Sequence, residues 1–382
     1  MLPKLAHVLC VCLAGLAGCG PRELPVLRLA APSAGRVEPL LVAPSGPEVR
    51  ESEEPTGLNA EATLTLYHRC LAFYRPTPVG EGASCPAPAA RSEVVDSPVG
   101  VLGAAETFRH NRKLLEGAFP DLAGALQLVA ASRDDVAAIW LVRGTHEGDF
   151  SPPQGPVIAP TGKKVAVLVA HVLELKEGQV SEELLYWDPR TLLAQIGALP
   201  GGARKEPTTG APEVRVTTAG SDTERANLGL YDAYVAALNG RDSSRLVSLM
   251  SDDVVVSAQS AQADVSGKKA VERAMQELWS GVSDLNVETR SVWAAGDYVV
   301  AKSQLSGTHA GALPALNLPV KTGRPVAWSR LEVIEIREGQ LRRVWSFENG
   351  AALAMQLGVT GGAARPDAAP SPTAEPAASG PR

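Results

Sequence analysis

One segment of the sequence occurs twice, and this repeat limits the folds that the chain can adopt. The first copy reads Gly144-Thr145-His146 with Thr161-Gly162 after a loop, and the second reads Gly307-Thr308-His309 with Thr322-Gly323 after its loop. Each copy continues into an alternating stretch that ends in a Glu-Gly-Gln turn. A repeat on this scale predicts two copies of one domain of roughly 130 residues.

The chain of 382 residues is long enough for two hydrophobic cores, and Pro and Gly are concentrated outside the two copies. Such stretches bury too little apolar surface to offset the entropy of ordering them. We therefore expect a signal peptide at 1–19, a disordered tether at 20–59, the first domain at 60–200, a linker at 201–222, the second domain at 223–358 and a disordered tail at 359–382.

The N-terminus has the pattern of an export signal. Lys4 precedes an apolar run from Leu5 to Leu16 that is too short to remain as a transmembrane helix. The run ends in Leu16-Ala17-Gly18-Cys19, which resembles the bacterial lipoprotein signal and implies a lipid on Cys19 as the membrane partner. Gly20 after the cysteine implies the outer membrane of the cell envelope, facing the periplasm. The alternative is an ordinary signal peptide with a chance cysteine.

Two cysteines, Cys70 and Cys85, remain after removal of the signal peptide and lipidation of Cys19. A pair of cysteines in an oxidising compartment indicates a disulfide. The alternative is two free buried thiols, because spacing alone does not bring the sulfurs together.

Charge and motifs exclude several functions. The net charge of −6 provides no basic patch for nucleic-acid phosphates, so we expect no nucleic-acid partner. The sequence has no Gly-rich phosphate loop, no nucleophile elbow and no His or Cys cluster at metal spacing. We therefore expect no cofactor and no metal site.

Hydrophobic periodicity predicts helices followed by strands in both copies. In the first domain we expect helices at 64–74 and 104–118, strands at 136–146, 165–175 and 180–187, and a short terminal helix reaching Gly197. In the second we expect helices at 228–238, 245–250 and 268–279, a turn at Asn239-Gly240, and then strands. The loop Pro76–Pro88 replaces the short helix in the first domain and is expected to form an altered lid.

The strand at 136–146 is apolar on both sides. Val136, Ala138 and Trp140 share the inward face by period two, but Ile139 and Leu141 lie on the outward face. We expect this outer face to be covered, by the sister domain or by a second molecule in a homodimer.

Several motifs resemble the SnoaL-like polyketide cyclase or ester cyclase family of the nuclear transport factor two-like superfamily. They are Phe119-Pro120-Asp121-Leu122, Gly144 to Gly148, Pro160-Thr161-Gly162, and Asp188-Pro189 with Leu193 to Gly197. The resemblance implies an α+β fold of two cone-shaped domains, each a curved antiparallel sheet wrapped around helices, with a pocket inside. It covers both domains and is firmer in the first.

The family's cyclases move protons with a histidine on the long strand and a carboxylate on the final strand. Carried over by position, the histidine falls at His171 and Glu332, and the carboxylate falls at Leu185 and Ser346. Leucine transfers no proton and serine is a poor acid. The resemblance thus implies that neither copy retains the family's carboxylate.

The candidate site residues are polar or aromatic side chains on the expected strands. His146, His171 and His309 either contact a ligand or are hydrogen-bonded core residues. Arg330 and Glu332 either pair with each other or clamp a polar ligand. The aromatic candidates, Trp140, Tyr186 and Trp328, either stack on a ligand or pack in the core.

We expect a membrane-anchored lipoprotein whose domains are non-catalytic and bind a small, largely apolar ligand or a protein partner. The alternative is a divergent cyclase, isomerase or hydrolase that uses His171 and His146. We expect the ligand in the first domain, because Arg330 and Glu332 would fill the second with their own ion pair. Replacing His171 by Ala should then weaken binding by about 1–2 kcal/mol through the loss of one buried hydrogen bond.

Overall fold

The computed structural model describes residues 59–71, 91–97, 101–103, 115–152, 156–199, 204–207, 213–314 and 321–358. These residues all belong to one compact unit, Pro55–Arg382. The predictions for the signal peptide, Cys19, the tether, the tail, Cys85 and the loop Pro76–Pro88 lie outside the described residues, as does the side chain of Cys70. No described helix is both long and apolar enough to cross a membrane.

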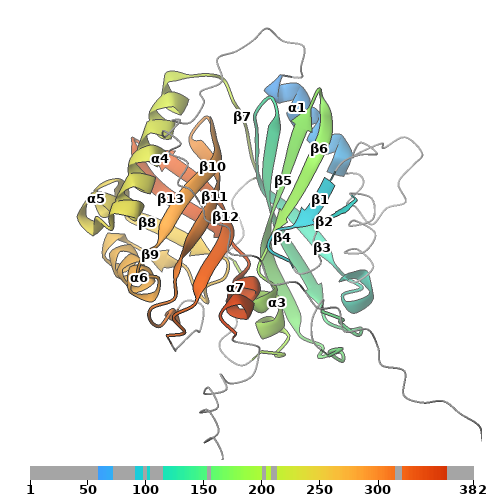
Figure 1. Ribbon diagram of the computed structural model, residues 1–382. Helices are drawn as coiled ribbons and strands as arrows, with labels where there is room; N and C mark the ends of the chain where they lie inside the picture. Colours follow the sequence, from blue (N-terminus) through green and yellow to red (C-terminus); the bar gives the residue numbers. More distant parts are fainter. Residues whose placement is uncertain are drawn as a thin grey trace, which may run out of the picture. The chain divides into compact units, whose positions relative to one another are not determined.

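The first copy of the repeat forms a seven-stranded sheet in the order β2-β1-β6-β5-β4-β3-β7 (Figure 1). Its strands are β1 (Arg91–Val94), β2 (Val101–Gly103), β3 (Ala123–Ala131), β4 (Asp135–Thr145), β5 (Lys164–Lys176), β6 (Gln179–Tyr186) and β7 (Val214–Thr217). Its helices are α1 (Ala60–Leu71) and α3 (Pro189–Gln195). Residues 115–118 are also helical and stop just before Pro120, as the proline predicts.

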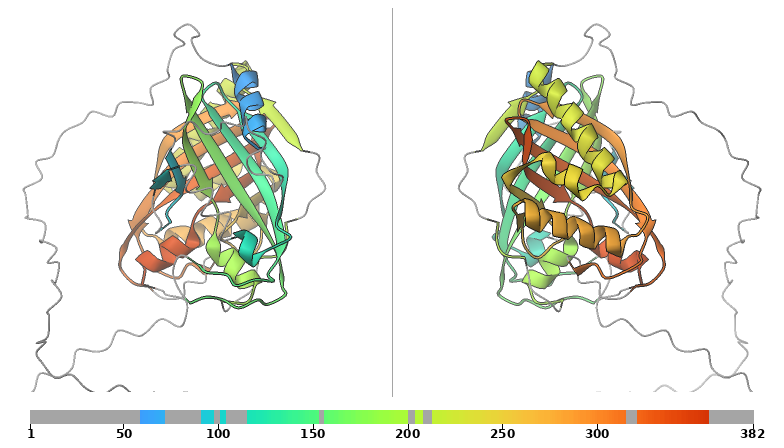
Figure 2. Two further views of the ribbon diagram at one scale, coloured as in Figure 1. Left: turned by 90° about the vertical axis from the view of Figure 1, so that its right-hand side faces the viewer. Right: turned by 90° about the vertical axis from the view of Figure 1, so that its left-hand side faces the viewer.

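The second copy forms a six-stranded sheet in the order β10-β11-β12-β13-β8-β9. Its strands are β8 (Met250–Ala258), β9 (Val265–Ser266), β10 (Asn286–Ala295), β11 (Tyr298–Thr308), β12 (Pro325–Arg337) and β13 (Gln340–Phe347). Its helices are α4 (Asp222–Gly240), α5 (Ser243–Ser248), α6 (Lys268–Gly281) and α7 (Gly350–Gln356). Figure 2 shows α4 and α6, in yellow and orange, lying across one face of this sheet.

The α+β class is confirmed, and the sheets are mixed. Most neighbouring strands are antiparallel, but β1 pairs with β6, β3 with β7 and β8 with β13 in parallel. A hairpin cannot join parallel neighbours, so each of these pairs is connected through a longer stretch of chain. The antiparallel core formed by β4, β5 and β6 corresponds to the strands expected from the period-two pattern.

Two local expectations differ from the structure. The segment 201–222, expected to be a linker, contains β7, whose Val214 lies opposite Leu128 at the edge of the first sheet. The turn expected at Asn239-Gly240 begins later, because α4 continues through Gly240 and ends at Arg241, which has a φ of 53°. A left-handed residue of this kind commonly closes a helix.

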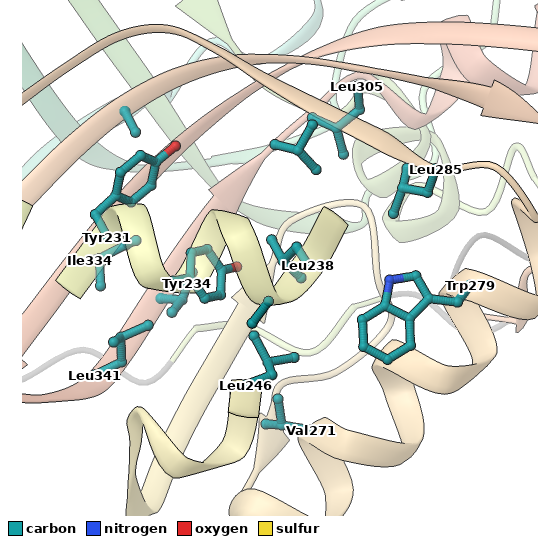
Figure 3. Close-up of a cluster of buried hydrophobic side chains, with 14 of the residues drawn as sticks. Tyr231, Tyr234, Leu238, Leu246, Val271, Trp279, Leu285, Leu305, Ile334 and Leu341 are labelled. Atoms are coloured by element: carbon teal, nitrogen blue, oxygen red, sulfur yellow. The ribbon is translucent and has the colours of Figure 1, made fainter. Parts of the chain in front are cut away.

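The start of α4 follows from its sequence. Ser221 caps the helix by accepting from Glu224 N, and the Glu224 side chain accepts from Ser221 N in return. Glu224 also accepts from Gly296 N at 2.9 Å, which joins the cap to the loop between β10 and β11. The helix then buries Tyr231, Tyr234 and Leu238 against the sheet (Figure 3).

The outward faces of the two sheets share one hydrophobic cluster. Ile139, Leu141 and Leu168 from the first sheet lie in this cluster with Val300, Leu331 and Val333 from the second. The second sheet therefore covers the apolar outward face of β4. Removing this much aliphatic surface from water is the main favourable contribution to the pairing of the sheets.

Polar contacts surround this cluster. Asp96 accepts from Ser329 N at 2.7 Å, and Thr191 Oγ1 donates to Gln259 O at 2.9 Å. Arg204 is 7% exposed and donates to the carbonyls of Ala258 and Ala261. These bonds connect residues far apart in sequence, so they fix the register of one sheet against the other.

Candidate functional site

A chain of hydrogen bonds runs through the interior of the first domain around His171. His171 Nε2 lies 2.6 Å from Glu183 Oε1, and the Ser92 hydroxyl donates to Glu183 Oε2 at 2.7 Å. On the other side of the ring, Nδ1 lies 3.3 Å from the Tyr67 hydroxyl, which accepts from Trp140 Nε1 at 2.9 Å. Side chains from α1, β1, β4, β5 and β6 therefore form one network.

Strand register places these groups together. His171 lies directly opposite Leu185 in the β5–β6 ladder, and Glu183 is two residues earlier on the same face of β6. The parallel pairing of β1 with β6 then sets Ser92 opposite Glu183. Side chains at alternate positions of a strand point to one face, so His171, Glu183 and Ser92 all turn towards the interior.

The first domain therefore has a carboxylate near the position where the family resemblance implied none. Leu185 does lie opposite His171, as expected, but Glu183 reaches the ring diagonally from the next inward position of β6. A diagonal neighbour across a ladder is within reach of a long side chain. The sequence contained an indication of this carboxylate, because Glu183 and Leu185 are two residues apart and therefore lie on the same face of β6.

One arrangement of protons satisfies the network. With Glu183 ionised, His171 Nε2 donates to the carboxylate and Nδ1 is left as an acceptor for the Tyr67 hydroxyl. The Tyr67 oxygen in turn accepts from the indole of Trp140. A carboxylate that holds a histidine in one tautomer and stabilises its protonated form is the arrangement used in general acid–base sites.

Burial sets the electrostatics of the network. Tyr67 is fully buried and His171 and Glu183 are each 3% exposed. Burial raises the pKa of Tyr67 well above its usual value, and the nearby charge of Glu183 raises it further, whereas the hydrogen bond from Trp140 opposes the shift. Tyr67 is therefore a neutral phenol that can donate a hydrogen bond at neutral pH.

The second domain has different groups at the equivalent positions. Glu332 lies opposite Ser346 in the β12–β13 ladder, as the comparison with the family predicted. Glu332 also pairs with Arg330 at 3.1 Å. The Tyr234 hydroxyl donates to Glu332 Oε1 at 3.0 Å. The expected ion pair is thus present, and Val344 occupies the position equivalent to Glu183.

Burial also affects the Arg330–Glu332 pair. Desolvation raises the pKa of Glu332, and the guanidinium of Arg330 opposes that shift. A buried pair of this kind is costly to break from one side, because the remaining charge is then left uncompensated.

His146 and His309 occupy equivalent structural positions. His146 Nδ1 lies 3.1 Å from Thr161 Oγ1, and His309 Nδ1 lies 3.0 Å from Thr322 Oγ1. Both rings are fully buried, and burial lowers the pKa of each. The His146 ring packs against Phe119 and Phe150 in a cluster separate from the one around Tyr67. Both histidines therefore hold the turn that follows the Gly-Thr-His motif.

Other contacts are repeated around this motif. Asp121 accepts from Thr145 N at 2.6 Å and from Thr145 Oγ1 at 2.7 Å, and Asp284 accepts from both groups of Thr308 in the same way. At Gly144, an added Cβ would lie 3.2 Å from the side chains of Leu122 and Phe119, so a glycine fits best there. The repeated sequence motif is therefore explained by packing and turn geometry.

The aromatic candidates lie in different environments. Trp140 and Trp328 are inward, and Trp328 Nε1 donates to Glu348 Oε2 at 2.9 Å. Tyr186 lies one residue out of phase with Leu185 and packs in the buried cluster between the sheets, which is the core alternative. Within the described segments, no group of three or more His, Cys, Asp or Glu side chains is placed to hold a metal ion.

Comparison with solved structures gives matches that each span about a third of this chain. AclR of Streptomyces galilaeus, described as a hydroxylase, is 25% identical, with coverage of 36% of this chain and 87% of its own and a TM-score of 0.32. A protein of Jannaschia sp. CCS1, described as a SnoaL-like polyketide cyclase, is 21% identical, with 37% and 99% coverage and a TM-score of 0.34. TsrD of Streptomyces laurentii is 22% identical, with 36% and 97% coverage and a TM-score of 0.32.

Comparison with curated proteins gives no significant match. The family model described as SnoaL-like polyketide cyclase matches twice, at residues 89–196 and 229–357. These two segments hold the two sheets, with β7 alone outside them, and together make up more than half of the chain. The chain therefore belongs to the SnoaL-like polyketide cyclase family, with one domain of that family in each half.

Proposed function

We propose that the first domain binds a small, largely apolar molecule and that His171, oriented by Glu183, acts on it as an acid–base group. The observation that carries this proposal is the 2.6 Å contact between His171 Nε2 and Glu183 Oε1 in a buried setting. A histidine oriented by a carboxylate is a common general acid–base group in enzymes. The reaction class is proton transfer next to a carbonyl, as in a cyclase or isomerase.

The network assigns a role to each group. Glu183 stabilises the imidazolium that forms when His171 takes up a proton, and Ser92 holds the second carboxylate oxygen. Tyr67, neutral at this depth, donates its hydrogen bond to a ligand carbonyl when it turns from His171 Nδ1, and Nδ1 then accepts the proton. Hydrogen bonds to a developing oxyanion in a dry site lower the barrier most effectively.

A second candidate is binding without catalysis. It is favoured by the engagement of both ring nitrogens of His171 and by the full burial of Tyr67. Hydrogen-bonded groups at this depth also occur as structural parts of a core. The two candidates differ in whether a bound ketone exchanges its α-protons.

The test uses the full-length protein and 1-tetralone, an apolar ketone with exchangeable α-protons. Deuterium incorporation from D₂O is followed by NMR, and binding is followed by the line widths of the same ketone. We expect the wild-type protein to accelerate exchange about 100-fold over solvent, and His171→Gln to remove that acceleration.

The control variant is His309→Gln, which alters a buried histidine in the other domain. Binding without accelerated exchange would support the non-catalytic candidate. Accelerated exchange that persists in His171→Gln would exclude His171 as the base.

We also propose that the chain is anchored to the bacterial cell envelope through a lipid on Cys19, in the outer membrane and facing the periplasm. The support is the sequence Leu16-Ala17-Gly18-Cys19 after an apolar run. Mass spectrometry of the protein from the membrane fraction should show an acylated N-terminal cysteine, and Cys19→Ser should accumulate as unprocessed precursor. A wild-type protein recovered without detergent and without an acyl mass would contradict the anchor.

A further inference from the structure

The strands β3 and β10 occupy equivalent places in the two sheets but differ at their outer edges. Ala131 of β3 lies opposite Val136, and Ala294 of β10 lies opposite Val299. Val136 and Val299 each precede the histidine of a Gly-Thr-His motif by ten residues, so the two alanines are equivalent. The outer edge of β3 is covered by β7, whereas no strand among the described residues pairs with the outer edge of β10.

The strand that covers β3 comes from the stretch that leads into the second domain. β7 runs parallel to β3, with Val214 opposite Leu128 and Thr217 opposite Ala131. The equivalent stretch of β10 is Ser291–Ala294. An open edge of this kind presents backbone donors and acceptors that a further strand can pair with.

The sequence of β7 recurs in front of the first domain. Pro212-Glu213-Val214-Arg215 leads into β7, and Pro47-Glu48-Val49-Arg50 stands at the equivalent place before α1. The buried tyrosine of the following helix, Tyr231 or Tyr67, comes 16 residues after the arginine of the later copy and 17 residues after that of the earlier one. The repeat therefore extends upstream of both domains, and its first copy precedes the described part of the chain.

The start of α1 lies close to the open edge of β10. Thr217 Oγ1, at the end of β7, donates to Glu61 Oε1 in the first turn of α1 at 2.8 Å. The hydroxyl of the next residue, Thr218, donates to Ala294 O at 3.0 Å. Residues 53–58 join the repeated segment to the described start of α1, and an extended stretch of this length spans roughly 20 Å. The segment is therefore long enough to reach β10.

We propose that the segment Val49–Glu53 docks as a parallel strand on the outer edge of β10, as β7 does on β3. Val49 then lies opposite Ser291, in the register that Val214 has with Leu128. Docking covers an edge that another chain could otherwise pair with. It gives a defined place to part of the stretch 20–59 and does not rest on the acid–base activity of the first domain.

The ladder of β7 indicates which backbone groups of the segment face β10. Thr218 N donates to Ala131 O at 2.9 Å. In a parallel ladder, alternate residues of a strand bond to the same side, so Val216 also bonds towards β3. Its equivalent in the segment is Glu51. The N–H of Glu51 should therefore face β10, and the N–H of Arg50 should face solvent.

The segment should be held less firmly than β7. Val216 packs against the hydrophobic cluster between the sheets, and a glutamate stands at the equivalent position of the segment, Glu51. A carboxylate does not gain from contact with an apolar surface, so backbone hydrogen bonds dominate the docking. The outer edge of β10 should then exchange its amide protons faster than the edge of β3, but more slowly than an open edge.

Disulfide trapping in the full-length protein tests the register. Val49→Cys/Ser291→Cys places two thiols opposite each other in the proposed ladder, where neighbouring strands bring Cα atoms to about 5 Å, within range of a disulfide. The control, Ala43→Cys/Ser291→Cys, moves the first thiol six residues along the chain. After mild oxidation, mass spectrometry of non-reduced peptides should show the intrachain bond in roughly tenfold higher yield for the first variant.

Hydrogen exchange provides a second test without added cysteines. Glu51→Pro removes the N–H that should bond to β10, whereas the matched control Arg50→Pro removes an N–H that should face solvent, a position where an edge strand tolerates proline. Amide exchange in β10, measured by NMR on the full-length protein, should be roughly tenfold faster in Glu51→Pro than in the wild type. Arg50→Pro should leave it unchanged.

The proposal is overturned if the two cysteine pairs form the intrachain bond in similar yield, including none. A disulfide between two chains would also overturn it, because a second copy would then occupy the edge. Equal exchange in the two proline variants would exclude the proposed ladder. Should Ser291→Cys prevent folding, as judged by the thermal melt, the comparison of the proline variants decides the question.

Discussion

Asp121 in the first domain and Asp284 in the second hold the threonine of the same Gly-Thr-His motif with the same two hydrogen bonds. His171 and Glu332, in contrast, occupy equivalent inward positions on β5 and β12 with different chemistry. The two copies thus keep the contacts that shape the turns and differ in the groups that face the interior. A contact present in both copies is best explained by the fold, and a polar group present in one copy is a candidate for function.

The largest effect is expected at the face shared by the two sheets. Ile139 is 1% exposed between the sheets, and its equivalent in the second domain is Lys302, which forms an ion pair with Glu174 across the boundary. Ile139→Lys should lower the free energy of unfolding by roughly 3 kcal/mol or more, because it buries an unpaired charge. Thermal and urea melts of the full-length protein measure this.

The matched control is Val157→Lys, at an exposed apolar position, which should change the melt little. An Ile139→Lys protein as stable as the wild type would mean that the two sheets do not remain packed in solution.

The next effect concerns the network around His171 in the first domain. Glu183→Val gives the first domain the residue that the second domain has at the equivalent position, Val344. It leaves His171 Nε2 and the Ser92 hydroxyl without the carboxylate. We expect a loss of about 2–3 kcal/mol in unfolding free energy and loss of any proton-transfer activity. A double-mutant cycle with Ser92→Ala should give a coupling energy of about 1 kcal/mol. Additive losses would show that Ser92 and Glu183 do not interact.

The shared histidines should behave alike. His146→Ala and His309→Ala each remove a buried ring and its contact with a threonine hydroxyl, at 3.1 and 3.0 Å. Each should lower the free energy of unfolding by about 1–2 kcal/mol, and neither should alter ligand binding directly. Denaturant melts and probe titrations of the two variants check this. A selective loss of binding in folded His146→Ala would identify His146 as a ligand contact.

The smallest effect is a pH dependence at the cap of α3. Burial raises the pKa of Asp188 to about 6, despite hydrogen bonds from Thr191 and Arg190, whereas Asn349 caps the equivalent α7. The folded state then binds the proton more tightly than the unfolded chain. The contribution of Asp188 to the free energy of unfolding is therefore full below about pH 4 and is lost as the pH rises through about 6.

Asp188→Asn copies the second domain and should remove this slope. The difference in unfolding free energy between the wild type and the variant should change by about 1–2 kcal/mol between pH 4 and 7. A flat difference would show that the carboxyl of Asp188 is ionised in the folded protein as readily as in the unfolded chain.

Much of the fold could be predicted from the sequence. Period-two alternation identified β4, β5 and β6, and the apolar residues Ile139 and Leu141 indicated a covered outer face. Short strands were missed, because β1 and β7 have four residues each and too few positions to show a period. One of them carries Ser92, so part of the site was missed with it.

The site itself could be predicted only in part. The alternation of side chains along a strand correctly placed His171, Arg330 and Glu332 on inward faces. The same alternation was not applied to Tyr186, which packs between the sheets. Position-by-position comparison with the family put the carboxylate at Leu185, the residue directly opposite His171 in the β5–β6 ladder. The contact between His171 and Glu183 is diagonal across the ladder, so it depends on the length of the glutamate side chain and on the twist of the sheet. The strand register alone does not predict such a contact.

The central claim is that the acid–base group belongs to the first domain alone. It is tested most directly by deuterium incorporation into 1-tetralone, measured side by side for the wild-type protein, His171→Gln, Glu183→Gln and Arg330→Met/Glu332→Leu. The account predicts that the two first-domain variants lose the acceleration and that the folded second-domain variant keeps it. Loss of exchange in the second-domain variant, with normal exchange in His171→Gln, would contradict it.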